Sequence, residues 1–379
     1  MSKGAGGVFQ KLHVGKVRLL LFSCLLILIS VLIIIYSFKS EKPETREIAK
    51  RIVSQCEKDS SNRCLKSFFE EFAKEHEFEE TKTVLGAIQQ IKPSTEYCHP
   101  FAHAISIAEV EKDSENWLNV FSYVPESECS YGFFHGVIEG KYRSDRNFMI
   151  DDQLISSVCA RELNKVGFAR SCTHAFGHVL LVQEDGVVTH ALNTCDKLST
   201  NLANPCFQGV FMENIQKNNL TEGEVQSELW DENFFISQIQ LCNEYSGSKQ
   251  NECWRSLGPV IRAVKSEFDM AAACQSAKEY LSKRACIREV FGGELLQRLL
   301  NGDIESMDYC QFVNGNQEYR ECIRDLIDYV LLTSSSLRGG LSDYCKNMKD
   351  GEVNYCNEQV NTFFKDLGWR LEEVRATEE

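Results

Sequence analysis

The sequence predicts an all-α protein, a disulfide-stapled array of helical hairpins similar to an α-solenoid, behind a single N-terminal transmembrane helix. Three observations lead to this prediction: paired cysteines recur at a fixed period, the segments around them have helical periodicity, and one long N-terminal stretch carries no charge. From Cys159 onward the cysteines form six pairs that recur about every 35 residues. A period of that length is typical of stacked helical hairpins.

The N-terminal elements are predicted from charge and hydropathy. Residues 19–38 form an uncharged run of twenty residues, which as a helix matches the hydrocarbon thickness of a bilayer. Residues 1–18 contain three lysines, one arginine and no acidic residue, so we expect a short cytoplasmic N-terminus. A retained anchor is favoured over a cleaved signal peptide, whose apolar core is usually shorter. Residues 39–47 are charged and are predicted to be a tether, with helices starting near Ile48.

This topology places the bulk of the chain outside the cytoplasm, in a periplasm, at a cell surface or in a lumen. Of the 17 cysteines, 16 lie there and only Cys24 falls in the predicted span. Disulfides persist in such compartments, and the spacing contains no Cys-x-x-Cys knuckle of a zinc ribbon. The net charge of −14 makes a nucleic-acid partner improbable, because an acidic surface repels phosphate.

The cysteine pairs are predicted to staple neighbouring helices. Seven to twelve residues separate the cysteines of each close pair, often with turn formers such as Asn204-Pro205 and Ser246-Gly247. We therefore expect one helix to end near the first cysteine and the next to start at the second. The predicted bridges are Cys56/Cys64, Cys159/Cys172, Cys195/Cys206, Cys242/Cys253, Cys274/Cys286, Cys310/Cys322 and Cys345/Cys356, which leaves Cys98 and Cys129 as a long-range pair.

An insertion divides the array into two halves of different composition. Residues 48–216 carry most of the histidines, residues 217–232 form an insertion rich in Asn, Glu and Ser, and residues 233–379 continue the cysteine pairs without a histidine. The histidine-bearing half is therefore the place to look for chemistry. The second half offers only a repeat surface, on which a protein or peptide partner could dock.

Five of the eight histidines lie in three short segments, and within each segment the potential ligands are four residues apart. Residues four apart share one helix face, and two imidazoles so placed can bind one ion. Counted from the second cysteine of their units, His135 and His178 are both at position +6, so they should face the same way in a stacked array. The predicted metal ligands are His99, His103, His135, Glu139, His174 and His178.

This ligand set is larger than one structural zinc requires. It suits a divalent transition metal (iron, zinc or copper), either as two ions or as one ion with an open position. Haem b held between two histidines is the less favoured alternative. Glu139 or Glu213 could act as the base in metal-assisted hydrolysis, and oxygen activation is equally compatible with these residues.

Two other interpretations stay open at this stage. The histidines could form a purely structural hydrogen-bonded cluster in a scaffold for protein–protein interaction, or they could store or deliver a metal without turnover. Glycines accompany the histidines, notably Gly132, Gly136 and Gly140 at four-residue intervals. Glycine is unfavourable inside a helix, so a close approach is implied, either of two helices or of backbone and ligand. Helix packing is the favoured explanation.

Overall fold

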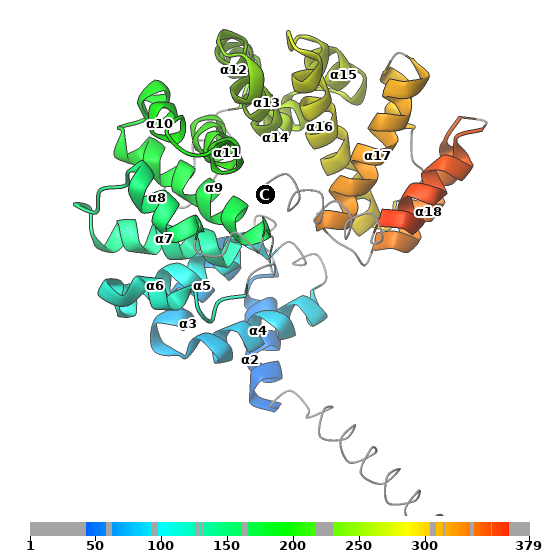
Figure 1. Cartoon of the computed structure of the whole chain (residues 1–379). Helices are drawn as coiled ribbons and strands as arrows, with labels where there is room; N and C mark the ends of the chain where they lie inside the picture. The colour runs from blue at the N-terminus through cyan, green and yellow to red at the C-terminus, as the bar shows by residue number, and fades with distance from the viewer. Residues whose placement is uncertain are drawn as a thin grey trace, which may run out of the picture.

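The computed structural model describes residues 43–57, 63–92, 98–125, 129, 132–160, 166–216, 230–303, 308–313, 315–333, 337–349 and 351–363. All regular elements within these ranges are helical, which confirms the all-α prediction (Figure 1). The predicted cytoplasmic segment and the transmembrane run at 19–38 lie outside the described residues. None of the helices that are described has the length and apolar character needed to cross a bilayer.

The helices of the histidine-bearing half are α2 (Pro43–Gln55), α3 (Arg63–Glu75), α4 (Phe78–Ile91), α5 (His99–Lys112), η2 (Ser114–Asn116), α6 (Trp117–Val120), α7 (Gly132–Ser144), α8 (Asp152–Cys159), α9 (Val166–Gln183), α10 (Val188–Cys195) and α11 (Thr200–Gln216). The second half contains α12 (Glu232–Glu244), α13 (Gly247–Ser256), α14 (Gly258–Val264), α15 (Glu267–Gln275), α16 (Tyr280–Leu300), η6 (Tyr309–Phe312), α17 (Asn316–Thr333), α18 (Arg338–Tyr344) and η8 (Cys345–Asn347). Residues 353–363 are also helical.

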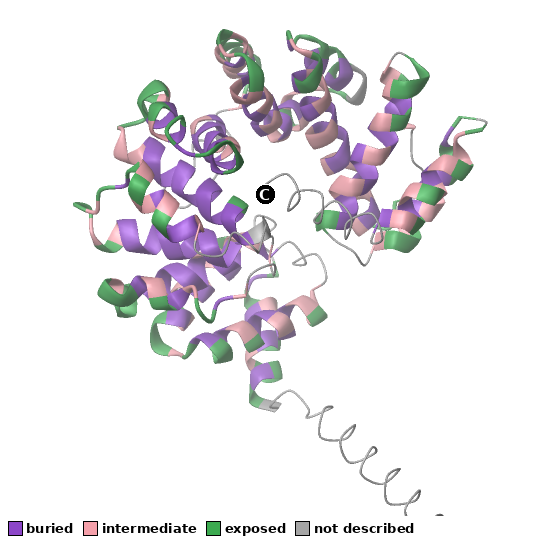
Figure 2. Ribbon diagram, viewed as in Figure 1, coloured by how far each residue is buried: buried purple, intermediate pink, exposed green. Residues whose placement is uncertain are grey.

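Helices pack in chain order along a curved path (Figure 1). The helices α5, α7, α9, α11, α13, α16 and α17 form a stacked series in which each contacts the next. The helices α8, α10, α12 and α15 each pack on the stacked helix that follows them and lie on the outside of the curve. Buried residues concentrate where successive helices meet (Figure 2). Each layer therefore obtains its core mainly from its neighbours, as in a helical repeat.

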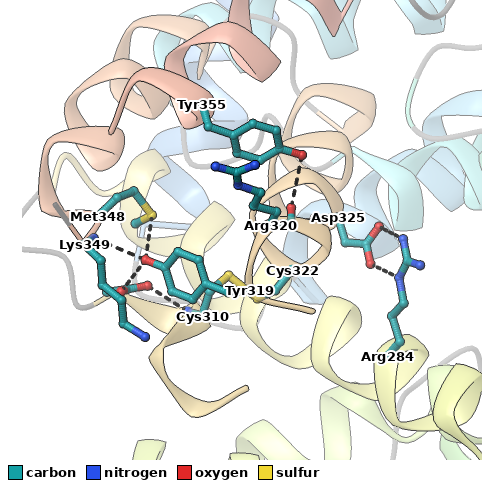
Figure 3. The surroundings of a disulfide bond; sticks show 10 residues. Arg284, Cys310, Tyr319, Arg320, Cys322, Asp325, Met348, Lys349 and Tyr355 are labelled. Atoms are coloured by element: carbon teal, nitrogen blue, oxygen red, sulfur yellow. Dashed lines mark hydrogen bonds and ion pairs between the residues drawn. A yellow bond between two sulfur atoms is a disulfide. The ribbon is translucent and has the colours of Figure 1, made fainter. Parts of the chain in front are cut away.

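All eight predicted disulfides are present, including the long-range bridge between Cys98 and Cys129. Figure 3 shows one of them, Cys310–Cys322, which joins η6 to α17 beside Tyr319. The Tyr319 hydroxyl donates to the Asp308 carboxylate at 2.6 Å, so a polar bridge reinforces the same junction. From Cys159 to Cys322 each disulfide thus joins a stacked helix to the helix that precedes it in the chain.

The expected start of each helix at its second cysteine is wrong. In α9, α11, α13, α16 and α17 the second cysteine is the seventh residue, so each helix begins almost two turns earlier. Pro205, expected in a turn, lies inside α11, whereas Ser246 does precede a helix, as the N-cap residue of α13. Each bridge therefore joins the end of one helix to an interior position of the next helix.

The boundaries of the linkers also differ in part. Helix α2 begins at Pro43, within the stretch expected to be a tether, and proline is favoured at the first position of a helix because its missing N–H has no intrahelical partner there. The insertion at 217–232 lies mostly outside the described residues. Its end is marked by Asp231, whose carboxylate accepts a hydrogen bond from the Phe234 amide and caps α12.

Replacing both Cys195 and Cys206 by Ala should lower the free energy of unfolding by about 3 kcal/mol, because the bridge closes a short loop. Both cysteines are fully buried between α10 and α11. The substitution therefore also removes buried contacts between these two helices. Chemical denaturation followed by circular dichroism measures the loss of stability. The matched control is Cys24→Ala, which should leave the midpoint unchanged; an equal shift in both variants would contradict the stapling role.

Candidate metal centre

Two pairs of helices in the histidine-bearing half approach each other through glycines. On α7, Gly132 lies against α5 so closely that an added Cβ would be 2.6 Å from the His99 carbonyl oxygen. At Gly136 an added Cβ would be 2.5 Å from the His103 carbonyl oxygen. Helix packing, the favoured explanation for these glycines, therefore accounts for them, and the backbone they contact belongs to the ligand histidines.

The pair α9 and α11 repeats this arrangement. An added Cβ at Gly209 would be 2.0 Å from the His174 carbonyl oxygen, and one at Gly177 would be 2.3 Å from the Cys206 carbonyl oxygen. Only glycine permits backbones this close. In both pairs, the helix that carries two histidines four residues apart is pressed against a following helix that supplies further polar groups.

The first group of imidazoles lies between α5 and α7. The Nε2 atoms of His99 and His103 are 3.0 Å apart, and His135 Nδ1 lies 3.2 Å from His103 Nε2. The outer nitrogens are held by acceptors, since His99 Nδ1 is 3.0 Å from the Cys129 carbonyl oxygen and His103 Nδ1 is 3.2 Å from Glu139 Oε2. Three imidazoles therefore converge, and two of them have fixed orientations.

The second group lies between α9 and α11, with His135 of α7 beside it. The Nε2 atoms of His174 and His178 are again 3.0 Å apart, and His178 Nδ1 is 3.0 Å from Glu213 Oε2. The His135 ring stacks on His174 with 5.0 Å between centroids. Buried His174 Nδ1 has no hydrogen-bond partner among the described residues. The two helix pairs thus present matching sets of imidazoles.

The structure brings all six predicted ligands together with Glu213. The histidines form two triads that could each hold a metal ion, one of His99, His103 and His135 and the other of His135, His174 and His178. His135 belongs to both. The two carboxylates occupy a different place from the one expected, because Glu139 and Glu213 contact the outer nitrogens of His103 and His178.

The remaining histidines lie apart from this site. His76 stacks on Phe72 and its Nδ1 lies 3.2 Å from Glu80, and His190 is exposed, with Nδ1 3.6 Å from Glu184. His13 lies outside the described residues. Five of the eight histidines thus gather at one site, and the described histidines elsewhere are isolated from it.

The facing nitrogens of His99 and His103 could hold a metal ion between them. Each ring has its Nδ1 against an oxygen that can only accept, so Nδ1 carries a proton, and in a neutral ring Nε2 then carries a lone pair. Two such lone pairs 3.0 Å apart would repel each other, and a cation between them relieves the repulsion. Burial, followed by the charge of His103, lowers the pKa of His99 to about 3, so the His99 ring is neutral at neutral pH.

A metal ion satisfies this geometry. Nitrogens bound at about 2.0–2.1 Å to one ion, at angles between square and tetrahedral, lie roughly 2.9–3.4 Å apart. The separations of 3.0 and 3.2 Å in the first triad fall in this interval. A histidine that binds a metal through one nitrogen usually donates its other N–H to a carboxylate or carbonyl group, as His99, His103 and His178 do here.

The electrostatic environment keeps the ligands in their binding form. Burial, reinforced by neighbouring imidazoles, holds the pKa values of His135 and His174 well below the usual value, so both rings are neutral. Burial opposes ionisation of Glu139, but the positive charge and hydrogen bond of His103 outweigh it and lower the Glu139 pKa to about 2. At Glu213 burial prevails and raises the pKa to about 7, despite the hydrogen bond from His178.

Some functional contacts were outside the reach of sequence reasoning. The carbonyl oxygen of Cys129, which orients His99, leaves no signature of residue type. Glu213 was identified as a candidate base, but its pairing with His178 was not, because its position in its unit differs from that of Glu139. The sequence signal for this pairing is that each helix with two histidines, α5 or α9, is followed in the stack by a helix with a glutamate, α7 or α11.

Substituting Gly136 by Ala should destabilise the protein and weaken metal binding together, because the new Cβ forces α7 away from α5 and separates His135 from His103. Overpacking of this kind typically costs about 1–3 kcal/mol. The control is Gly86→Ala in α4, where an added Cβ meets nothing within 4 Å. That variant should be as stable as the parent or up to about 1 kcal/mol more so. Thermal unfolding and metal titration of both variants test the pair, and unchanged metal affinity in Gly136→Ala would contradict the account.

Similarity to known proteins does not add to the description of this site. No family model, no curated protein and no solved structure matches the chain. The function is therefore argued from the geometry and chemistry of the histidine triads.

Proposed function

We propose that the chain is a membrane-anchored, extracytoplasmic metalloprotein whose two histidine triads bind divalent transition-metal ions. The observation that carries the proposal is the pair of Nε2 atoms of His99 and His103, which face each other 3.0 Å apart while both Nδ1 atoms contact oxygen acceptors. In neutral rings the lone pairs of these two atoms repel each other, and the repulsion ends when a cation binds between them. The second triad supplies the same Nε2 pair, with one buried nitrogen, His174 Nδ1, still unsatisfied.

The donor set favours ions over haem. Imidazole is a suitable ligand for zinc, copper and iron, and no thiolate competes, because every cysteine near the site is in a disulfide. Two axial histidines on opposite sides of a haem iron would have their nitrogens about 4 Å apart. The facing pairs here are 3.0 Å apart, which supports two ligands on one side of an ion.

Each residue has a distinct role in the proposed centre. His99 and His103 hold one ion, His174 and His178 hold the other, and His135, which is common to both triads, completes them. Glu139 and Glu213 fix the tautomers of their imidazoles and increase their basicity. The bound ions would supply Lewis-acid or redox chemistry.

We propose that most of the chain lies outside the cytoplasm, on the evidence of its disulfides and of the uncharged N-terminal run. Eight disulfides indicate an oxidising compartment outside the cytoplasm. We place the anchor at residues 19–38, with the N-terminus in the cytoplasm and the helical solenoid on the other side of the membrane.

A second role is proposed for the C-terminal repeats, as a docking surface for a protein or peptide. A recess of about 210 Å³ lies between α16 and α17, lined by charged and aromatic side chains that include Tyr280, Arg284 and Glu321. Such a lining is suited to a polar peptide segment. If the histidines prove purely structural, this scaffold role is the one that remains.

The full-length chain, produced in an oxidising compartment and reconstituted with Zn²⁺, Cu²⁺ or Fe²⁺, should bind two equivalents of one of these metals. His135→Asn should lose both ions, because both triads share that ligand, and His178→Asn should lose one. Elemental analysis after gel filtration gives the stoichiometry, and circular dichroism shows whether each variant is folded. His190→Asn, at an exposed position, is the control and should keep both ions. A folded, metal-free parent would favour the scaffold role instead.

A further inference from the structure

A second polar cluster continues the line of the metal centre into the C-terminal half. His174 lies two residues after the second cysteine of its unit, and Arg255 and Arg288 hold the same place in theirs. These positions belong to α9, α13 and α16, which are successive members of the stack apart from the intervening α11. The position two residues after the second cysteine therefore carries an imidazole in the first half and guanidinium groups in the second half.

The arginines gather around two glutamates. Arg255 Nη1 donates to both carboxylate oxygens of Glu252, at 3.0 and 2.8 Å, and its Nε lies 3.6 Å from Glu289 Oε1. Arg262 donates from Nη1 to the backbone carbonyl of Glu289. This cluster is half-buried and joins α13, α14 and α16.

Two guanidinium nitrogens in the cluster have no acceptor within hydrogen-bond distance among the described residues. Buried Nε of both Arg255 and Arg288 makes no hydrogen bond among the described residues. Arg284, on the same helix as Arg288, shows the contrast, because Asp325 and Glu321 bind it on two sides (Figure 3 shows the Asp325 pair). A buried donor without an acceptor is costly, so its persistence points to a ligand that supplies one.

Arg170 extends the cluster towards the metal centre. It precedes His174 by one turn of α9, a rise of about 6 Å. Its side chain is exposed to water, yet surrounding protein, followed by the like charge of Arg255, lowers its pKa, and Arg288 acts in the same direction. Arg170 thus lies on the same helix as His174 and within electrostatic reach of Arg255 and Arg288.

The charges of the cluster do not balance. Within the part of the chain that the structure describes, four guanidinium groups, those of Arg170, Arg255, Arg262 and Arg288, share two carboxylates, which leaves two positive charges without a carboxylate partner. A phosphate group carries about −1.5 to −2 at neutral pH and offers several acceptor oxygens. Guanidinium groups bind such an oxyanion through paired hydrogen bonds, which lysine does not.

We infer that Arg170, Arg255 and Arg288 form a binding site for a phosphate group, next to the second histidine triad. Arg170 lies one turn before His174 on α9, so a phosphate bound there is close to the second triad. This site is separate from the metal centre, and phosphate binding is expected with or without metal.

Isothermal titration of the metal-free full-length chain with inorganic phosphate tests the inference. The parent should bind phosphate, and Arg288→Met and Arg170→Met should each bind it at least about tenfold more weakly, since each removes charged hydrogen bonds. Arg288→Lys keeps the charge but cannot form the paired hydrogen bonds, so its affinity for phosphate should lie between those of the parent and Arg288→Met. The control is Arg320→Met, because Arg320 is paired with Glu352 on the surface, and this variant should bind like the parent.

Two further measurements keep the outcome decisive. His178→Asn, which disrupts the metal centre, should retain phosphate binding, so failure of one site is distinguishable from failure of the other. Glycerol phosphate and micelles containing phosphatidic acid, compared in the same titration, tell a soluble phosphate ester from a lipid headgroup, and binding of either supports the site. Absence of phosphate binding to the parent, or equal weakening in Arg320→Met, overturns the inference.

Discussion

The central constraint in this protein is the short contact between facing imidazole nitrogens. His99 and His103 face each other through Nε2 atoms 3.0 Å apart while their Nδ1 atoms are engaged by a carbonyl and a carboxylate oxygen. Burial depresses the pKa of His99, so this ring is neutral at neutral pH and its Nε2 can bind a cation. The proposed metal ion would lie between the two Nε2 atoms, and the neighbouring residues hold both imidazoles in the matching orientation.

The fold supports this constraint by two means. Disulfides fix α8 to α9 and α10 to α11, so the two helices of each pair cannot slide relative to each other. Glycines on α7 and α11 then let backbones meet at the residues that carry the ligands. Each glycine weakens its own helix, and the close packing offsets that loss. Rigid layers at short separation are what hold imidazoles of different helices within reach of one ion.

Much of this could be predicted from sequence because it depends on local periodicity. Spacings of four placed His99 with His103 and His174 with His178 on common helix faces, and the cysteine frame aligned those faces. The helix starts could not be predicted, since Pro205 reads as a turn and yet lies inside α11. Contacts such as Glu213 with His178 depend on how two helices cross, which residue spacing within one helix does not encode. Arg255 and Arg288 also hold equivalent positions after their cysteines, but their spacing in the sequence does not match a known phosphate-binding motif.

The most direct test of the central claim is a crystal structure of the metal-loaded protein with anomalous diffraction measured at the absorption edge of the bound metal. The account predicts one anomalous peak among His99, His103 and His135 and a second among His135, His174 and His178. An absence of peaks at both positions, with the facing nitrogens bridged by protons or water, would contradict it.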